Sequence, residues 1–158
     1  MDRIEGEDTR DESVDERMDR NFVELLQELR VVQTGTQILA AFLLTLPFQA
    51  RFSDLDDYTV GLFLTCVGLA FLTTILLVAP VSVHRVLFRR HRKAELVAIS
   101  HTFARAGLMT LGLTMAAVLC LVFTVVLGRP AGLIAAGTTA LLFGLTWWAL
   151  PLWLRSRA

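Results

Sequence analysis

Four stretches of the chain contain no charged residue, and each is at least 20 residues long. They cover residues 31–50, 58–83, 106–128 and 130–154. An α-helix rises 1.5 Å per residue, so about 20 apolar residues cross a hydrocarbon core that is ~30 Å thick. A chain of 158 residues with four such stretches therefore predicts an all-α fold. We expect a four-span transmembrane helix bundle, formed by residues 31–154, in which successive helices run up and down.

This pattern excludes several classes of protein. Apolar residues make up 54% of the chain, the mean hydropathy is +0.58, and the 15 basic and 15 acidic residues cancel. The charges gather between the apolar stretches instead of covering a globular surface. An ordinary soluble enzyme, a nucleic-acid binder and a secreted disulfide scaffold are all inconsistent with this distribution.

The first 30 residues divide into two parts. Residues 1–12 are acidic and nearly without apolar side chains, so we expect a disordered tail. Residues 13–30 begin with a capping box, Ser13 with Glu16, and continue with apolar residues at helical spacing. They predict an amphipathic juxtamembrane helix that runs into the first span. That helix either lies on the membrane surface or under the bundle, or it docks a partner protein.

The distribution of arginine and lysine predicts the orientation of the bundle, because cytoplasmic segments retain basic residues. The loop 84–105, the N-terminal flank and the tail 155–158 hold most of them, whereas only Arg51 and Arg129 fall on the opposite side of the spans. We therefore expect a multi-pass membrane protein with both termini in the cytoplasm. The tryptophans of the fourth span favour the headgroup zone on that same side.

The loop between the second and third spans carries the densest positive charge. Its basic side chains suit the phosphates of anionic lipids, at about 1 kcal/mol for each arginine or lysine near the surface. A partner protein is the other candidate ligand, and the same charges also suffice as a topological anchor. The candidate lipid- or partner-binding residues are His84, Arg85, Arg89, Arg90, Arg92 and Lys93.

One face of the first helix carries a polar stripe. Its residues recur every three or four positions, so they share one face, and in a membrane that face must meet protein or water. Hydrogen bonds between helices account for such a stripe, and a permeation path is the alternative. The stripe consists of Gln27, Arg30, Thr34, Gln37, Ala41 and Thr45.

The fourth span carries four small residues at a strict spacing of four. Small residues let two helix backbones approach closely, so this ladder predicts a helix-packing seam, either within one chain or between two. The seam consists of Gly132, Ala136, Ala140 and Gly144.

Several kinds of site have no signature in this sequence. No ionisable residue lies near the centre of a span, although coupled transporters generally need one there. No hydrolase, metalloprotease or phosphate-loop motif occurs. Cys66 and Cys120 lack the spacing of metal ligands and are expected to be buried free thiols at matched depth. We therefore expect no enzyme activity, no cofactor and no metal.

Three segments of the chain resemble a known family. They are Glu24–Arg30, Phe42–Phe48 and the region 79–97, which contains Ala79-Pro80, His84-Arg85 and Phe88-Arg89-Arg90. These residues resemble a group of small four-helix bacterial membrane proteins of unknown function. Members of that group are sometimes labelled sodium:proton antiporters, and the resemblance extends over roughly residues 20–128.

Together these observations predict a non-enzymatic membrane protein that engages anionic lipids or a partner protein. The expected contacts are lipid headgroups at the cytoplasmic face, a protein partner or a second copy of the chain, and no nucleic acid. The alternative function is a small transporter or a channel-like protein that moves ions or protons.

Overall fold

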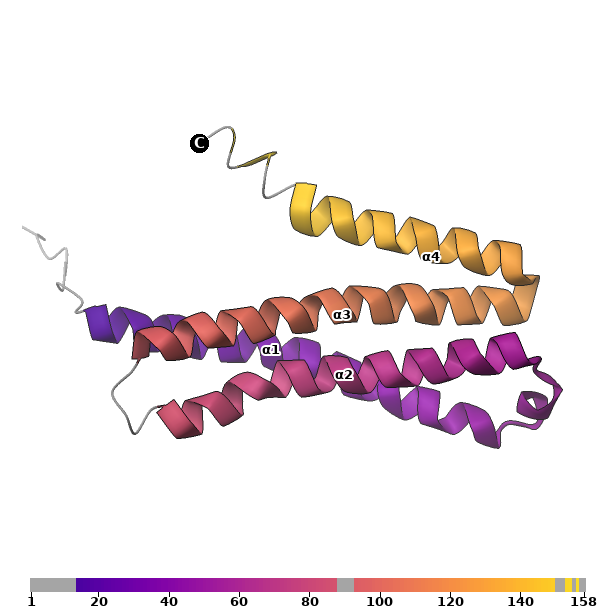
Figure 1. Ribbon diagram of the computed structural model, residues 1–158, viewed down its shortest axis with the longest axis horizontal. Coiled ribbons are helices and arrows are strands. Elements are labelled where there is room, and N and C mark those ends of the chain that lie inside the picture. Colours follow the sequence, from indigo (N-terminus) through magenta and orange to yellow (C-terminus); the bar gives the residue numbers. More distant parts are fainter. Residues whose placement is uncertain (1–13, 88–92, 150–152, 155, 157–158) are drawn as a thin grey trace, which may run out of the picture.

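A computed structural model of the protein describes residues 14–87, 93–149, 153–154 and 156. Within these residues the protein is all-helical, with four helices long and apolar enough to cross a membrane (Figure 1). This confirms the predicted all-α fold with four apolar helices. In chain order the helices are α1 (Val14–Thr45), α2 (Asp57–Leu87), α3 (Lys93–Leu127) and α4 (Arg129–Gly144).

The connections between the helices gather at two ends of the bundle (Figure 1). At the hairpin end, two short 3-10 helices, η1 (Leu46–Phe48) and η2 (Ala50–Asp54), join α1 to α2. Gly128 joins α3 to α4 at the same end, and its φ of 94° lies in the region that favours glycine. The start of α1, the end of α2 and the start of α3 lie at the opposite end, the terminal end, and α4 runs toward it.

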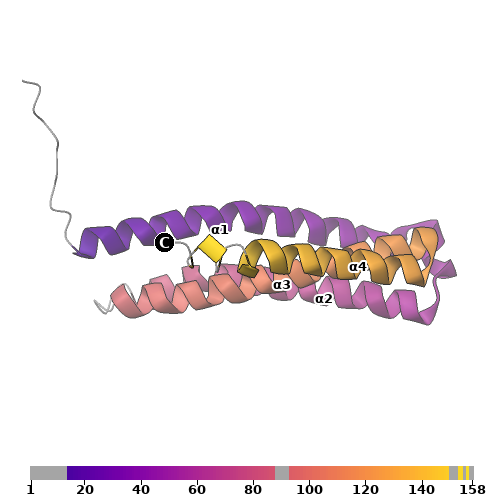
Figure 2. The same ribbon diagram turned by 90° about the horizontal axis from the view of Figure 1, so that it is seen from above.

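α1 contains both the expected juxtamembrane helix and the expected first span. It is one continuous helix of 32 residues (Figure 2). Leu29, in the amphipathic part, packs with Leu77 of α2 and Ala104 of α3. This part therefore continues the axis of the span, and its contact with a membrane surface or with a partner protein stays a prediction. The helix ends at Thr45, before the expected boundary at residue 50, because Pro47 restricts the residue before it and supplies no N–H.

The core lies between α1, α2 and α3, and the contact between α2 and α3 is the most extensive. Apolar residues fill it at the hairpin end, including Leu43, Phe63 and Leu121. In its middle the hydroxyls of Thr73 and Thr114 lie 3.1 Å apart and share a hydrogen bond between α2 and α3. This hydrogen bond helps to hold α2 and α3 together, because apolar contacts alone give little net attraction between helices in lipid.

Cys66 and Cys120 are free and buried, as expected from the sequence. Thr73 and Thr114 fix the pairing of the antiparallel helices α2 and α3. Cys66 precedes Thr73 by about two turns and Cys120 follows Thr114 by nearly two turns. The two thiols therefore lie at matched depth within one helical turn.

α4 packs on α3 and diverges from it toward the terminal end (Figure 1). The contact is closest at Gly132, which is buried against Cys120 and Thr124 of α3. After Gly144 the helix widens into a π-helical turn, η4 (Leu145–Ala149). The expected tails 1–12 and 155–158 lie outside the described residues, apart from Ser156.

Candidate functional site

The backbone places the predicted basic loop at the terminal end. His84 and Arg85 lie in the last turn of α2, and Lys93 is the first residue of α3. Arg89, Arg90 and Arg92 lie outside the described residues. The role of this loop stays a prediction. The structure shows that the loop joins two long antiparallel helices, α2 and α3.

Further basic side chains lie along the helices toward the same end. Arg20 forms an ion pair with Glu24, with 3.9 Å between nitrogen and oxygen. Arg30 of α1 and Arg105 of α3 are exposed. The hairpin end instead combines two arginines with Asp54, Asp56 and Asp57. The terminal end therefore carries most of the charges of both signs, because α1 also holds acids such as Glu24 and Glu28 there, and only the sequence of the loop 84–105 has a clear excess of basic residues.

The polar stripe of α1 lies on the surface of the single chain. Gln27, Arg30, Thr34, Gln37, Ala41 and Thr45 are all exposed. The hydroxyl of Thr34 donates to the Arg30 carbonyl, and the hydroxyl of Thr45 donates to the Phe42 carbonyl, both within α1. α1 packs through the opposite face, which buries Phe22, Leu29, Thr36, Ala40 and Leu43. A role between helices stays a prediction and requires a neighbour beyond this chain.

The four residues of the predicted seam have different surroundings. A Cβ built on Gly132 would lie 2.1 Å from the Thr124 hydroxyl oxygen and 2.6 Å from the Cys120 carbonyl oxygen. Ala136 is half-buried, whereas Ala140 and Gly144 are exposed. The structure therefore brings the first part of the ladder against α3 and leaves the second part along an open groove.

That groove lies between α3 and α4 toward the terminal end and has a volume of about 270 Å³. At its centre the ring of Phe143 lies against Gly112, at 3.2 Å from a Cβ built there. Phe143 also contacts Trp147 edge to face, with 5.2 Å between the ring centroids. The lining is apolar and consists of Leu108, Met109, Gly112, Leu113, Ala140, Phe143, Gly144 and Trp147.

A charged cluster at the hairpin end joins the starts of α2 and α4. The Asp56 carboxylate accepts a hydrogen bond from the Thr59 backbone N–H at 3.0 Å, which caps α2. It also accepts the Thr59 hydroxyl and pairs with Arg129. The Arg129 guanidinium carbon lies 4.5 Å from the centre of the Tyr58 ring. These hydrogen bonds from Thr59, and then Arg129, lower the pKa of Asp56 to about 2.

This charged cluster was not predicted from the sequence. Its local part was visible, since Asp56 three residues before Thr59 is a capping pattern. Its partner Arg129 lies 73 residues away in the sequence, so only the folded arrangement of two hairpins brings the ion pair together. The cluster, called the clasp below, joins the two hairpins through the Asp56 cap of α2, the Asp56–Arg129 ion pair and the contact of Arg129 with the Tyr58 ring.

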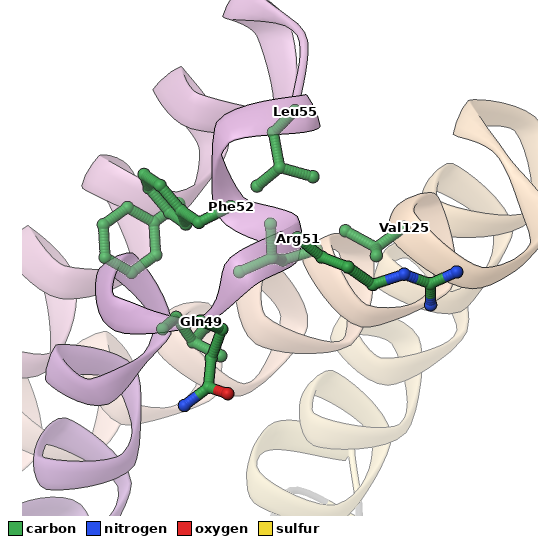
Figure 3. A pocket seen from close by; sticks show the side chains of 8 residues that line it. Gln49, Arg51, Phe52, Leu55 and Val125 are labelled. Atoms are coloured by element: carbon green, nitrogen blue, oxygen red, sulfur yellow. The ribbon is translucent and has the colours of Figure 1, made fainter.

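A small pocket lies beside this clasp, between the connecting segment and the ends of α2 and α3 (Figure 3). Its volume is about 120 Å³, less than half that of the groove between α3 and α4. Phe52 packs edge to face on Phe63 at 5.2 Å beside it. In Figure 3 the Gln49 amide and the Arg51 guanidinium point away from its apolar floor. The pocket presents no polar group that could take part in catalysis. It is a small apolar gap between the connecting segment and the helices.

No group of three or more histidine, cysteine or acidic residues with the geometry of a metal site occurs among the described residues. The expected absence of a metal stays a prediction. In comparisons with known proteins, the model of a family described as "Family of unknown function (DUF6328)" matches residues 11–151. No curated protein and no solved structure matches the chain.

Proposed function

The chain belongs to DUF6328, a family of unknown function, and we propose that it engages anionic lipid headgroups as a non-enzymatic protein of the bacterial cytoplasmic membrane. The terminal end then lies in the cytoplasm, with both termini and the loop 84–105. This orientation follows the retention of basic residues on the cytoplasmic side.

The position of the basic loop carries the proposal. The backbone from Asp57 to His84 is helical, which corresponds to about 40 Å at 1.5 Å per residue. Because a hydrocarbon core is ~30 Å thick, His84 and Arg85 stand at the level of the headgroups when α2 starts at the opposite boundary. The helix thus brings the backbone at Arg85 to the depth of the lipid phosphates, and arginine binds phosphate with paired hydrogen bonds.

Spin-labelled lipids test the proposal on the full chain in vesicles. The motionally restricted fraction of labelled phosphatidylglycerol, compared with labelled phosphatidylcholine, gives the relative association constant of the anionic lipid. Replacing Arg85, Arg89, Arg90 and Arg92 with glutamine should lower this constant, by up to about fivefold for each arginine, and more at low salt than at high salt. The matched control is Arg51→Gln at the hairpin end. An unchanged selectivity in the loop variant contradicts the proposal.

A small transporter or channel-like protein is the second candidate function. One observation favours it: the polar stripe of α1 is exposed in a single chain, so several copies can enclose it. Purified protein in liposomes should then carry a saturable flux of Na⁺ or H⁺ under an imposed gradient. A flux equal to that of empty liposomes rejects this candidate and leaves lipid engagement.

A further inference from the structure

The groove between α3 and α4 lies in the half of the bundle toward the terminal end. Along α3, the lining residues Leu108 to Leu113 stand about 21 to 28 Å from Leu127 at the hairpin end. In a ~30 Å hydrocarbon core these are the depths of the acyl chains in the leaflet at the terminal end. The groove is apolar throughout and opens sideways, so an acyl chain can enter it from the bilayer.

A cation stands directly beyond the groove. Arg105 precedes Met109 by four residues and Gly112 by seven, so all three share one face of α3. Arg105 stands about 33 Å from Leu127, just past the hydrocarbon boundary. Its side chain is exposed, and the structure shows no ion pair for it among the described residues. His101, one turn further, is exposed on the same face.

Trp147 lies at the end of the groove that faces Arg105. Gly112 lies against Phe143, and Trp147 follows Phe143 by one turn toward the terminal end. This places its ring beside Leu108, close to the hydrocarbon boundary, where tryptophan is favoured. The groove therefore combines an apolar slot, an aromatic ring at the interface and an arginine at headgroup depth.

A second groove between α3 and α4 lacks this combination. It lies toward the hairpin end and has a volume of about 510 Å³. Neither groove has a basic residue in its own lining, so the two differ in the arginine that stands beyond each of them. The nearby Arg129 already pairs with Asp56 and covers the Tyr58 ring. Charge complementarity with an anionic headgroup thus distinguishes the groove that ends at Arg105.

We propose that this groove binds one anionic phospholipid of the leaflet at the terminal end. One acyl chain lies along Gly112, Phe143 and Gly144, and the phosphate accepts hydrogen bonds from Arg105. The site rests on the proposed engagement of anionic lipid and makes it specific: a single lipid bound between two helices, separate from the charges of the loop 84–105.

Quenching of Trp147 tests the site in the full chain. The chain has three tryptophans, so replacing Trp148 and Trp153 with phenylalanine leaves Trp147 as the only indole. The probes are phosphatidylglycerol and phosphatidylcholine with brominated acyl chains, each at the same mole fraction in phosphatidylcholine vesicles. The brominated anionic lipid should quench Trp147 with a relative association constant about fivefold higher, the value of one basic residue near the surface. Equal quenching by the two lipids overturns the inference.

Two pairs of variants separate the site from general attraction. Arg105→Gln should bring the ratio of the two constants close to one, whereas Arg30→Gln on α1 should leave it unchanged. Gly144→Leu fills the groove and should also lower the ratio. Gly137→Leu is its matched control, because a Cβ at either glycine meets nothing within 4 Å and Gly137 lies outside the groove.

The loop variant distinguishes this inference from the proposed function. With Arg85, Arg89, Arg90 and Arg92 replaced by glutamine, the quenching ratio at Trp147 should persist while the overall lipid selectivity falls. A ratio that falls with the loop variant and not with Arg105→Gln rejects the groove as a lipid site and leaves lipid engagement by the loop intact.

Discussion

Replacement of Gly132 by alanine tests the contact that holds α4 to the bundle. The new Cβ would lie 2.6 Å from the Cys120 carbonyl oxygen, a backbone atom that no side-chain rotation can move. Ordinary contacts of a Cβ begin at 3.4 Å, so α4 must move by about 0.8 Å away from α3 at this level. The Thr124 hydroxyl, at 2.1 Å, must turn away as well.

The cost of this change follows from packing. A gap of 0.5–1 Å removes roughly a quarter to a half of the van der Waals attraction between the groups that it separates. Overpacked sites generally lose about 1–3 kcal/mol. Alanine also has a higher helix propensity than glycine by about 1 kcal/mol, which hides part of the loss. Gly137→Ala on the same helix has that gain without the clash, because a Cβ at Gly137 meets nothing within 4 Å.

The assay is reversible unfolding in mixed micelles, with the two variants compared directly. Gly132→Ala should be less stable than Gly137→Ala by about 1–3 kcal/mol, since the difference cancels the helix propensity. Adding Thr124→Ala to Gly132→Ala should recover only part of the loss, because the Cys120 carbonyl remains in place. Equal unfolding midpoints for Gly132→Ala and Gly137→Ala would refute the close approach of α3 and α4.

Two further predictions concern the hairpin end and the thiols. Hydrogen bonds from Thr59, followed by Arg129, lower the pKa of Asp56 to about 2. The ionised Asp56 carboxylate should contribute its full share to the free energy of unfolding above a pH of about 3.9, the pKa of an aspartate in the unfolded chain. This contribution should be lost as the pH falls toward 2. The stability of Asp56→Asn should not show this loss between about pH 4 and pH 2. An identical dependence of stability on pH in the wild type and in Asp56→Asn contradicts the prediction. Cys66 and Cys120 are buried and should react slowly with a membrane-impermeant maleimide in intact cells. Rapid labelling would show that a water-filled cavity reaches them and would favour the transporter.

The sequence predicted the helices well, because length and hydropathy suffice to identify segments that can cross a membrane. α3 contains the whole third apolar stretch except Gly128 and begins before it, at Lys93. The buried face of α1 was not predictable in the same way. Lipid is as apolar as a protein core, so an apolar face does not tell which neighbour it meets. The structure buries Leu29 and Leu43 and leaves Gln37 on the surface.

The candidate sites were predictable only where they depend on local sequence. The small residues of α4 form a strict ladder, but two straight helices that diverge contact each other along only part of their length. Gly132 therefore meets α3, whereas Gly144 borders an open groove. The pairing of Asp56 with Arg129 joins residues from different hairpins, and a one-dimensional pattern contains no record of that proximity.

Cysteine accessibility at the two ends of the bundle tests the central claim, that four helices cross the membrane with the terminal end in the cytoplasm. Ser53 at the hairpin end and Ser156 at the terminal end are both exposed, so each accepts a single cysteine in a chain whose Cys66 and Cys120 are alanine. In intact cells, a membrane-impermeant maleimide should label Ser53→Cys at once and Ser156→Cys only after permeabilisation. Labelling of Ser156→Cys in intact cells, or protection of Ser53→Cys, would contradict the account.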